Sequence, residues 1–408
     1  RGADLYGLRG YRKGGKVRRI DLPEEDMKCP GFGWSAGVRS WDFLPGGEMA
    51  VARCKNQRTG KVTLKFVNLE TGSVEKTVSD LHALDVSGVS VCPDGSIVYV
   101  GGSHDSPGSV HALSPPYDSP GCHSIISSAL KPTDPIVPYV SSFVKPEHIT
   151  FPGPAGTVHA SLYLPPSPPP NLTLPPLLVK AHGGPTSSCS TSWRLDVQFW
   201  VSRGWAVVDV DYSGSDGYGR EYRERLKGEW GSLDWKDCEA AASFLVSRGD
   251  VDGGRIAIDG GSAGGYTTLC CLAFSDVFKA GCSKYGISDL KALYHETHKF
   301  ESRYMDGLIG PITTHEGVYD ARCPINHLSG FSCPALFLQG SEDKVVPPNQ
   351  SRMMFDALKE KGLDTAMVVY EGEQHGFRKD ENRKHSLEVE EDFFNRIFGI
   401  QGGGGVKV

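Results

Sequence analysis

The sequence predicts an α/β domain built on a mostly parallel sheet and preceded by a partial β-propeller. Over the first 135 residues, short alternating strands follow one another with few helix signals, whereas from about residue 140 apolar strands alternate with helices. Such alternation is typical of a parallel sheet with helices on both faces. We expect a partial propeller over residues 1–135, the α/β domain over residues 140–400 and a flexible Gly-rich tail over residues 401–408.

A repeat in the first domain predicts the propeller. Residues 44–51 and 92–99, which lie 48 positions apart, each hold a Pro-x-Gly turn followed by an apolar strand, and residues 61–69 predict another strand. A period near 50 with several strands per unit is typical of propeller blades. Only about two blades fit, while propellers usually have four to eight, so we expect earlier blades to be missing from this chain. A small β-sandwich is the alternative, which the repeat disfavours.

The local pattern of the second domain predicts its first elements. Residues 157–164 alternate as an antiparallel strand, and residues 205–210 are typical of a buried parallel strand. The Pro-rich residues 165–176 lie between apolar strands, so we expect them to form a hairpin loop. Residues 234–248 predict an amphipathic helix, with Asp234 as its cap and Gly249 at its end.

The most informative motif is Gly-x-Ser-x-Gly, centred on Ser262. An apolar strand at residues 255–259 precedes it and an apolar helix at residues 267–274 follows it. This context is typical of the nucleophile elbow of an α/β hydrolase. The elbow strains the backbone and leaves no room for a Cβ beside the serine, which accounts for Gly260 and Gly264. The alternative, a Gly-rich loop with an incidental serine, does not explain the flanking strand and helix.

A serine nucleophile needs a base, and in this fold an acid and then a histidine follow it along the chain. Strands at residues 334–339 and 366–370 are followed by Asp343 and His375. Both residues lie just past the carboxyl end of a strand, where ligands bind in open α/β sheets. We expect His375 to act as the general base and Asp343 to fix its tautomer, with Glu342 as the rival acid.

The strand at residues 177–181 ends in a His-Gly-Gly-Pro sequence. In α/β hydrolases, the oxyanion hole combines an N–H group of this loop with the N–H of the residue after the nucleophile. Here these residues are Gly183 or Gly184, and Ala263. Because His375 already fills the position of the base, we expect His182 to have a structural role under the loop.

Composition excludes several classes of function. The net charge of −6 and the lack of a basic patch argue against a nucleic-acid partner, and no run of 18 apolar residues predicts a membrane span. Eleven cysteines without a CxxC pair predict buried thiols in a reducing compartment, so we expect a cytoplasmic protein. N-glycosylation sequons at Asn171 and Asn349 would instead favour a secreted protein.

Together, these motifs resemble the prolyl oligopeptidase family of serine peptidases, and most of all its acylaminoacyl-peptidase-type branch. The resemblance covers about residues 140–400 and also rests on residues 211–219 and 229–231. It implies cleavage of short peptides, a propeller that restricts entry, and no metal or organic cofactor. Some relatives have an oxyanion-binding Tyr where this chain has His182, so a backbone-only hole is implied. The resemblance is compatible with a homo-oligomer.

Other sequence features leave the substrate open. Residues 295–304 would line a specificity pocket, with Phe300 and Tyr304 as apolar walls and Arg303 as a carboxylate anchor; a charged cap helix is the alternative. His295 and His298 have no third ligand, so we predict no metal site. Dipeptidyl-peptidase relatives bind a free amine with acidic residues, and residues 24–25 are adjacent glutamates, although most such pairs are solvated.

Three functions agree with these motifs to different degrees. The first is a serine peptidase that acts through an acyl-enzyme. The second is a carboxylesterase, because the same triad hydrolyses esters more easily than amides; a propeller favours the peptidase. The third is a non-enzymatic binding protein on an inactive hydrolase scaffold, against which the complete set of Ser262, Asp343 and His375 argues.

Overall fold

The computed structural model describes residues 40–56, 61–79, 81, 85–296 and 302–401. The chain divides into two compact units, each with its own core. The first comprises Arg1–His148, Ser190–Leu195 and Asp216–Arg223, and the second comprises Ile149–Cys189, Asp196–Ser215 and Glu224–Val408. Among the described residues, no helix combines the length and the apolar character needed to cross a membrane.

The first unit contains two four-stranded antiparallel sheets, each with its strands in sequence order. The strands of one sheet are β1 (Trp41–Phe43), β2 (Met49–Lys55), β3 (Val62–Asn68) and β4 (Val74–Val78); those of the other are β5 (Asp85–Val91), β6 (Ile97–Ser103), β7 (Ser106–Leu113) and β8 (His123–Ser127). A short 3-10 helix, η2 (Val137–Ser142), follows. The repeat places the same turn in both sheets, because Gly47 N donates to Leu44 O (3.0 Å) and Gly95 N donates to Cys92 O (2.9 Å).

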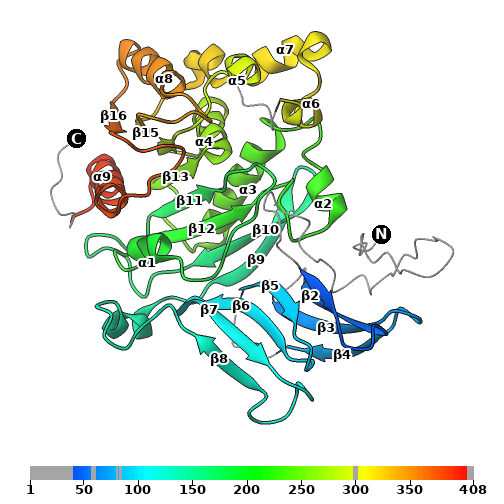
Figure 1. Cartoon of the computed structure of the whole chain (residues 1–408). Coiled ribbons are helices and arrows are strands. Elements are labelled where there is room, and N and C mark those ends of the chain that lie inside the picture. Colours follow the sequence, from blue (N-terminus) through cyan, green and yellow to red (C-terminus); the bar gives the residue numbers. More distant parts are fainter. Residues whose placement is uncertain (1–39, 57–60, 80, 82–84, 297–301, 402–408) are drawn as a thin grey trace. The chain divides into compact units, whose positions relative to one another are not determined.

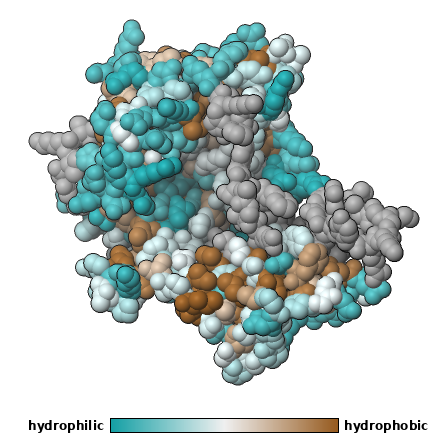
Figure 2. Space-filling view, viewed as in Figure 1, coloured by the Kyte–Doolittle hydropathy of each residue, from teal (hydrophilic) through white to brown (hydrophobic). Residues whose placement is uncertain are grey.

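Apolar side chains of both sheets form one core, which includes Leu64, Phe66, Ile97 and Tyr99. The sheet of β5–β8 also carries large apolar side chains at its surface, and brown surface gathers over this sheet in Figure 2. Among these residues, Val100 is 42% exposed, Ile125 56% and Ile126 60%.

The second unit is built on an eight-stranded mixed sheet with the order β16-β15-β14-β13-β11-β12-β10-β9. Its strands are β9 (Glu147–Gly153), β10 (Gly156–Tyr163), β11 (Leu177–Ala181), β12 (Ala206–Asp211), β13 (Ile256–Gly261), β14 (Ala280–Lys284), β15 (Ala335–Gly340) and β16 (Thr365–Tyr370). Its helices, shown in Figure 1, are α1 (Leu195–Val201), α3 (Leu233–Arg248), α4 (Ala263–Phe274), α5 (Leu290–Glu296), α6 (Tyr304–Leu308), α7 (Ile312–Arg322), η3 (Pro324–Gly330), α8 (Pro348–Glu360) and α9 (Asp380–Phe398); α2 (Arg220–Glu224) lies between β12 and α3 in the sequence.

The strands from β11 to β16 run parallel, as the βα alternation predicts, whereas β10 runs antiparallel to β12. The prediction that residues 165–176 form a hairpin loop is wrong, because β12 lies between β10 and β11 in the sheet. A Pro-rich segment marks a connection, but it does not specify which strands pair.

The helix α3 ends as predicted, at Gly249 in the left-handed conformation (φ 77°). The prediction that Asp234 caps this helix is wrong. Ser232 occupies the N-cap position, and Asp234 lies buried in the first turn, where its carboxylate accepts hydrogen bonds from Gly231 N (2.7 Å) and Thr267 Oγ1 (2.7 Å). Asp234 therefore joins α3 to α4, the helix that follows Ser262.

Side-chain alternation along the central strands sends residues to two helical layers. Val179 and Ile258 belong to a core cluster that includes side chains of α3 and α4. On the other face, α1 and α9 pack together, with the rings of Trp200 and Phe394 6.0 Å apart. The sheet is thus covered by helices on both faces (Figure 1).

Candidate active site

Ser262 lies between the last residue of β13 and the first residue of α4, in a strained backbone conformation (φ 57°, ψ −122°). Such a conformation costs about 1–3 kcal/mol and persists only where the surroundings hold it. Ser262 N donates to Lys284 O (2.9 Å) on the neighbouring strand. A Cβ on Gly260 would collide with Gly264 O, and one on Gly264 would collide with Ala181 O, so both positions require glycine.

The structure brings Ser262 and His375 within hydrogen-bond distance, with 2.8 Å between Ser262 Oγ and His375 Nε2. On the other side of the ring, His375 Nδ1 lies 2.8 Å from Asp343 Oδ2. Asp343 is buried, and its Oδ1 accepts hydrogen bonds from the backbone N–H groups of Val345 (2.9 Å) and Val346 (3.0 Å). These contacts orient the carboxylate toward His375, whereas Glu342 is exposed.

Two residues that the sequence analysis did not identify hold the His375 loop in place. Tyr285 packs its ring edge-on against His375, with 5.0 Å between the ring centroids, and burial raises the pKa of its hydroxyl. Glu373 is buried, and its carboxylate accepts hydrogen bonds from Arg378 N (2.9 Å) and Lys379 N (2.9 Å). Tyr285 belongs to no motif with a known spacing and directly follows β14. Glu373 lies two residues before His375, inside the motif of residues 372–377 that contributes to the family resemblance, but the sequence assigned it no role of its own.

The glycines after β11 lie next to the serine. A Cβ on Gly183 would come within 3.6 Å of Ser262 Cβ and 3.1 Å of Gly261 O. Gly184 has a positive φ of 122°, and a Cβ there would lie 2.7 Å from Ser187 N, so this loop also requires glycine. Ala263 is the first residue of α4, and the first N–H groups of a helix have no partner within that helix.

His182 packs under this loop. Its Nδ1 lies 2.8 Å from Gly183 O, its Nε2 lies 2.6 Å from Ser215 Oγ, and its ring stacks on Tyr212 with 4.2 Å between the centroids. Tyr212 in turn donates to His182 O (2.7 Å). Burial lowers the pKa of His182, which favours the neutral ring. These contacts support the shape of the loop.

Of the three residues predicted to line a specificity pocket, Tyr304 lies near the glycine loop, whereas Arg303 points to solvent. Tyr304 lies at the start of α6, and its hydroxyl lies 2.9 Å from Thr186 Oγ1, two residues after Gly184. Arg303 is largely exposed and forms an ion pair with Asp306 (3.0 Å). Phe300, His298 and residues 24–25 lie outside the described residues.

Residues 190–401, just over half of the chain, match the sequence model of the prolyl oligopeptidase family. The chain belongs to the prolyl oligopeptidase family. The family resemblance expected from the motifs is therefore confirmed.

Curated relatives match about half of the chain. Dipeptidyl aminopeptidase BIII of Pseudoxanthomonas mexicana is 30% identical over 230 residues, which are 55% of this chain and 33% of that protein. Acylamino-acid-releasing enzyme 1 of Oryza sativa subsp. japonica is 31% identical over 214 residues, which are 50% of this chain and 28% of that protein. The aligned regions thus amount to about a third of the length of these relatives.

Solved structures match almost the whole chain. A puromycin-hydrolyzing peptidase of Mycobacterium tuberculosis has a TM-score of 0.85 and 37% identity, over 97% of this chain and 59% of that one. The Pyrococcus horikoshii acylaminoacyl peptidase has a TM-score of 0.71 and 21% identity, over 88% of this chain and 56% of that one, and so shares the fold. The predicted fold class, an α/β hydrolase preceded by a partial β-propeller, is confirmed.

Proposed function

We propose that this member of the family is a serine peptidase that hydrolyses short peptides and aminoacyl amides through an acyl-enzyme. One observation carries the proposal: a continuous hydrogen-bonded chain runs from Ser262 through His375 to Asp343, with 2.8 Å at each step. Its serine stands on the strained turn between β13 and α4. This combination is the arrangement that activates a serine hydroxyl for attack on a carbonyl group.

In the proposed reaction, Ser262 Oγ attacks the carbonyl carbon of the scissile amide while His375 Nε2 accepts the hydroxyl proton. The carbonyl π electrons move to the oxygen, which becomes an oxyanion. When the intermediate collapses, the C–N bond breaks and His375 returns the proton to the leaving amine. Water then attacks the acyl-enzyme in the same way, with His375 again as the base. Asp343 stabilises the imidazolium that forms in each half.

The oxyanion is stabilised by backbone N–H groups in this proposal. Ala263 N–H, at the N-terminus of α4, is the first donor, and the N–H of Gly183 or Gly184 is the second. The proximity of Gly183 to Ser262 supports this assignment. His182 is assigned to the structure of the loop, because its ring nitrogens lie against Gly183 O and Ser215 Oγ.

The proposed substrate class follows from the similar proteins. Two solved neighbours, 33% and 37% identical, are described as a puromycin hydrolase and a puromycin-hydrolyzing peptidase. Puromycin holds an aminoacyl group through an amide bond, so an aminoacyl amide is the first substrate to test. The position of Tyr304 beside Thr186 supports an aromatic wall near the oxyanion loop. Phe300 and Arg303 remain candidates for the rest of this pocket.

A substrate panel tests the proposal. The 408-residue chain is assayed on aminoacyl, N-acyl-aminoacyl and dipeptidyl chromogenic amides and on a simple ester, with Ser262→Ala as the control. We expect amide hydrolysis that the control abolishes. Hydrolysis of the ester alone would support a carboxylesterase instead, because the same triad cleaves esters more easily. Activity on neither class would support a binding protein on a hydrolase scaffold.

We also infer a cytoplasmic location. The ten cysteines among the described residues are all free thiols, which supports this inference. Free thiols persist in a reducing compartment.

A further inference from the structure

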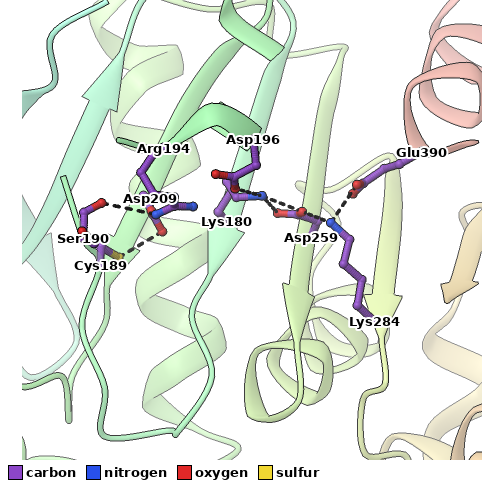
Figure 3. A network of polar contacts seen from close by, with 9 residues as sticks. All are labelled: Lys180, Cys189, Ser190, Arg194, Asp196, Asp209, Asp259, Lys284 and Glu390. Atoms are coloured by element: carbon purple, nitrogen blue, oxygen red, sulfur yellow. Dashed lines mark hydrogen bonds and ion pairs between the residues drawn. The ribbon is translucent and has the colours of Figure 1, made fainter. Parts of the chain in front are cut away.

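Four charged side chains lie together between the eight-stranded sheet and α9 (Figure 3). They are Lys180 on β11, Asp259 on β13, Lys284 on β14 and Glu390 on α9. All are nearly removed from solvent: the side chain of Glu390 is 0% exposed, and even that of Lys284 is only 16% exposed. Burying a charge is costly unless it is paired, and a paired charge is still weak evidence for stability. The presence of this charge cluster therefore calls for a reason other than stability.

Cations and anions alternate along the cluster. Lys180 Nζ donates to both oxygens of Asp259 (3.0 and 2.7 Å). Lys284 Nζ donates to Asp259 Oδ2 (2.6 Å) and lies 2.7 Å from Glu390 Oε2. The formal charges of the four side chains sum to zero, and burial raises the pKa of Glu390 to about 7. Asp196, partly exposed on α1, lies farther away, 3.7 Å from Lys180.

The register of the sheet puts these groups on one face. Lys180 pairs directly with Asp259, and Lys284 pairs with Gly261, two residues beyond Asp259. Side chains two residues apart on a strand share a face, so Asp259 and Lys284 point toward the same helical layer. Lys284 thereby connects the strand that leads to Ser262 with the helix α9.

The backbone of Lys284 is also part of the candidate active site. Its carbonyl oxygen accepts the hydrogen bond from Ser262 N (2.9 Å). The next residue, Tyr285, has a positive φ of 40° and packs its ring against His375. A displacement of Lys284 would thus reach both the proposed nucleophile and the proposed base.

We propose that the ion pair between Lys284 and Glu390 positions Ser262 and His375 by anchoring the end of β14 to α9. Lys284 and Glu390 are positioning residues in this account, because they act through Ser262, Tyr285 and His375. The strained backbone of Ser262 needs surroundings that hold it, and the anchored Lys284 carbonyl supplies one such contact. The inference rests on the proposed function, since it concerns the same site.

The chain offers a matched control on the same helix. Glu391, the next residue of α9, is also buried and forms an ion pair with Arg203 (2.9 Å). Arg203 lies after α1, and within the part of the chain that the structure describes its side chain contacts Phe199, Ser202 and Glu391, none of which belongs to β14. Loss of the Arg203–Glu391 pair should therefore affect stability without moving Ser262.

The test compares K284M/E390Q with R203M/E391Q. Each double variant removes one cation and one anion, so the charge stays balanced, and K284M/E390Q keeps the Lys180–Asp259 pair. Three quantities are measured for folded protein: kcat and KM on the amide that the unaltered chain cleaves best, the rate of fluorophosphonate labelling of Ser262, and Tm. The single variant E390Q is a milder change in case K284M/E390Q does not fold.

We expect K284M/E390Q to lose roughly 10- to 100-fold in kcat with little change in KM, because small displacements of reacting groups have effects of this size. Labelling of Ser262 should slow in parallel, and E390Q should show a smaller loss of the same kind. R203M/E391Q should keep kcat within about twofold, whatever its Tm. A folded K284M/E390Q or E390Q with unaltered kcat and labelling would overturn the inference, as would an equal loss in the control. If the unaltered chain neither hydrolyses the amide nor reacts with the fluorophosphonate, the proposed function itself is overturned.

Discussion

Asp343 Oδ2 lies 2.8 Å from His375 Nδ1, and this contact distinguishes Asp343 from its exposed neighbour Glu342. The two acids are adjacent in the sequence, and the pattern of residues alone cannot separate them. The turn after β15 does so, because the N–H groups of Val345 and Val346 hold the Asp343 carboxylate in a buried position. Figure 1 shows β15 and β16, the two strands that carry these loops, next to each other.

This geometry makes a prediction about two neighbouring variants. Asp343→Asn should lower kcat by roughly 10⁴, because an amide at this position favours the wrong tautomer of the histidine. Glu342→Gln should leave kcat nearly unchanged. Both variants are assayed on the same aminoacyl amide. The reverse order of effects would assign the acid to Glu342.

The glycines of the elbow make a prediction about stability. Gly264→Ala should destabilise the protein by about 3 kcal/mol or more, because its Cβ would meet the rigid backbone of Ala181. Gly307→Ala, in α6, is the control: a Cβ there has nothing within 4 Å, so the change should be neutral or slightly stabilising. Urea denaturation of both variants measures the difference. Equal free energies of unfolding would contradict the close packing of β11 against the elbow.

A buried acid on α3 predicts a pH dependence of stability. Burial raises the pKa of Asp237 from 3.8 to about 6, although a hydrogen bond from Ser213 N (2.7 Å) partly offsets this effect. The folded protein therefore holds a proton that the unfolded chain releases near pH 4. Its contribution to stability is full below pH 4 and is lost as the pH rises through about 6, which amounts to about 3 kcal/mol.

Asp237→Asn removes this titration, so its free energy of unfolding relative to the unaltered chain should rise by about 2 kcal/mol between pH 4 and pH 7, because part of the loss has already occurred at pH 4. Denaturation curves at several pH values measure the change. Asp356→Asn, on the exposed side of α8, controls for replacing an acid with an amide. A difference between Asp237→Asn and the unaltered chain that stays constant with pH would refute the assignment.

Local motifs predicted much of this molecule because their chemistry depends on residues close together in the sequence. Ser262 needs glycines at positions 260 and 264, and the 48-residue repeat places equivalent turns at Gly47 and Gly95. Strand pairing is different, because it depends on the whole sheet. The position of β12 between β10 and β11 could not be predicted from the Pro-rich connection between them.

The charge cluster escaped prediction for the same reason. Lys180, Asp259 and Lys284 each stand in an apolar strand, which is an unusual place for a charge and was a signal that could have been used. Their pairing, however, depends on the register of three strands and on the position of α9. Tyr285 likewise meets His375 only when β14 and the loop after β16 come together.

The most direct test of the central claim is to react the 408-residue chain with a fluorophosphonate and to locate the adduct by peptide mass spectrometry. We expect a single adduct on Ser262, no adduct in Ser262→Ala, and a loss of amide hydrolysis in step with labelling. An adduct on another residue, or hydrolysis that survives in Ser262→Ala, would contradict the assignment of Ser262 as the nucleophile.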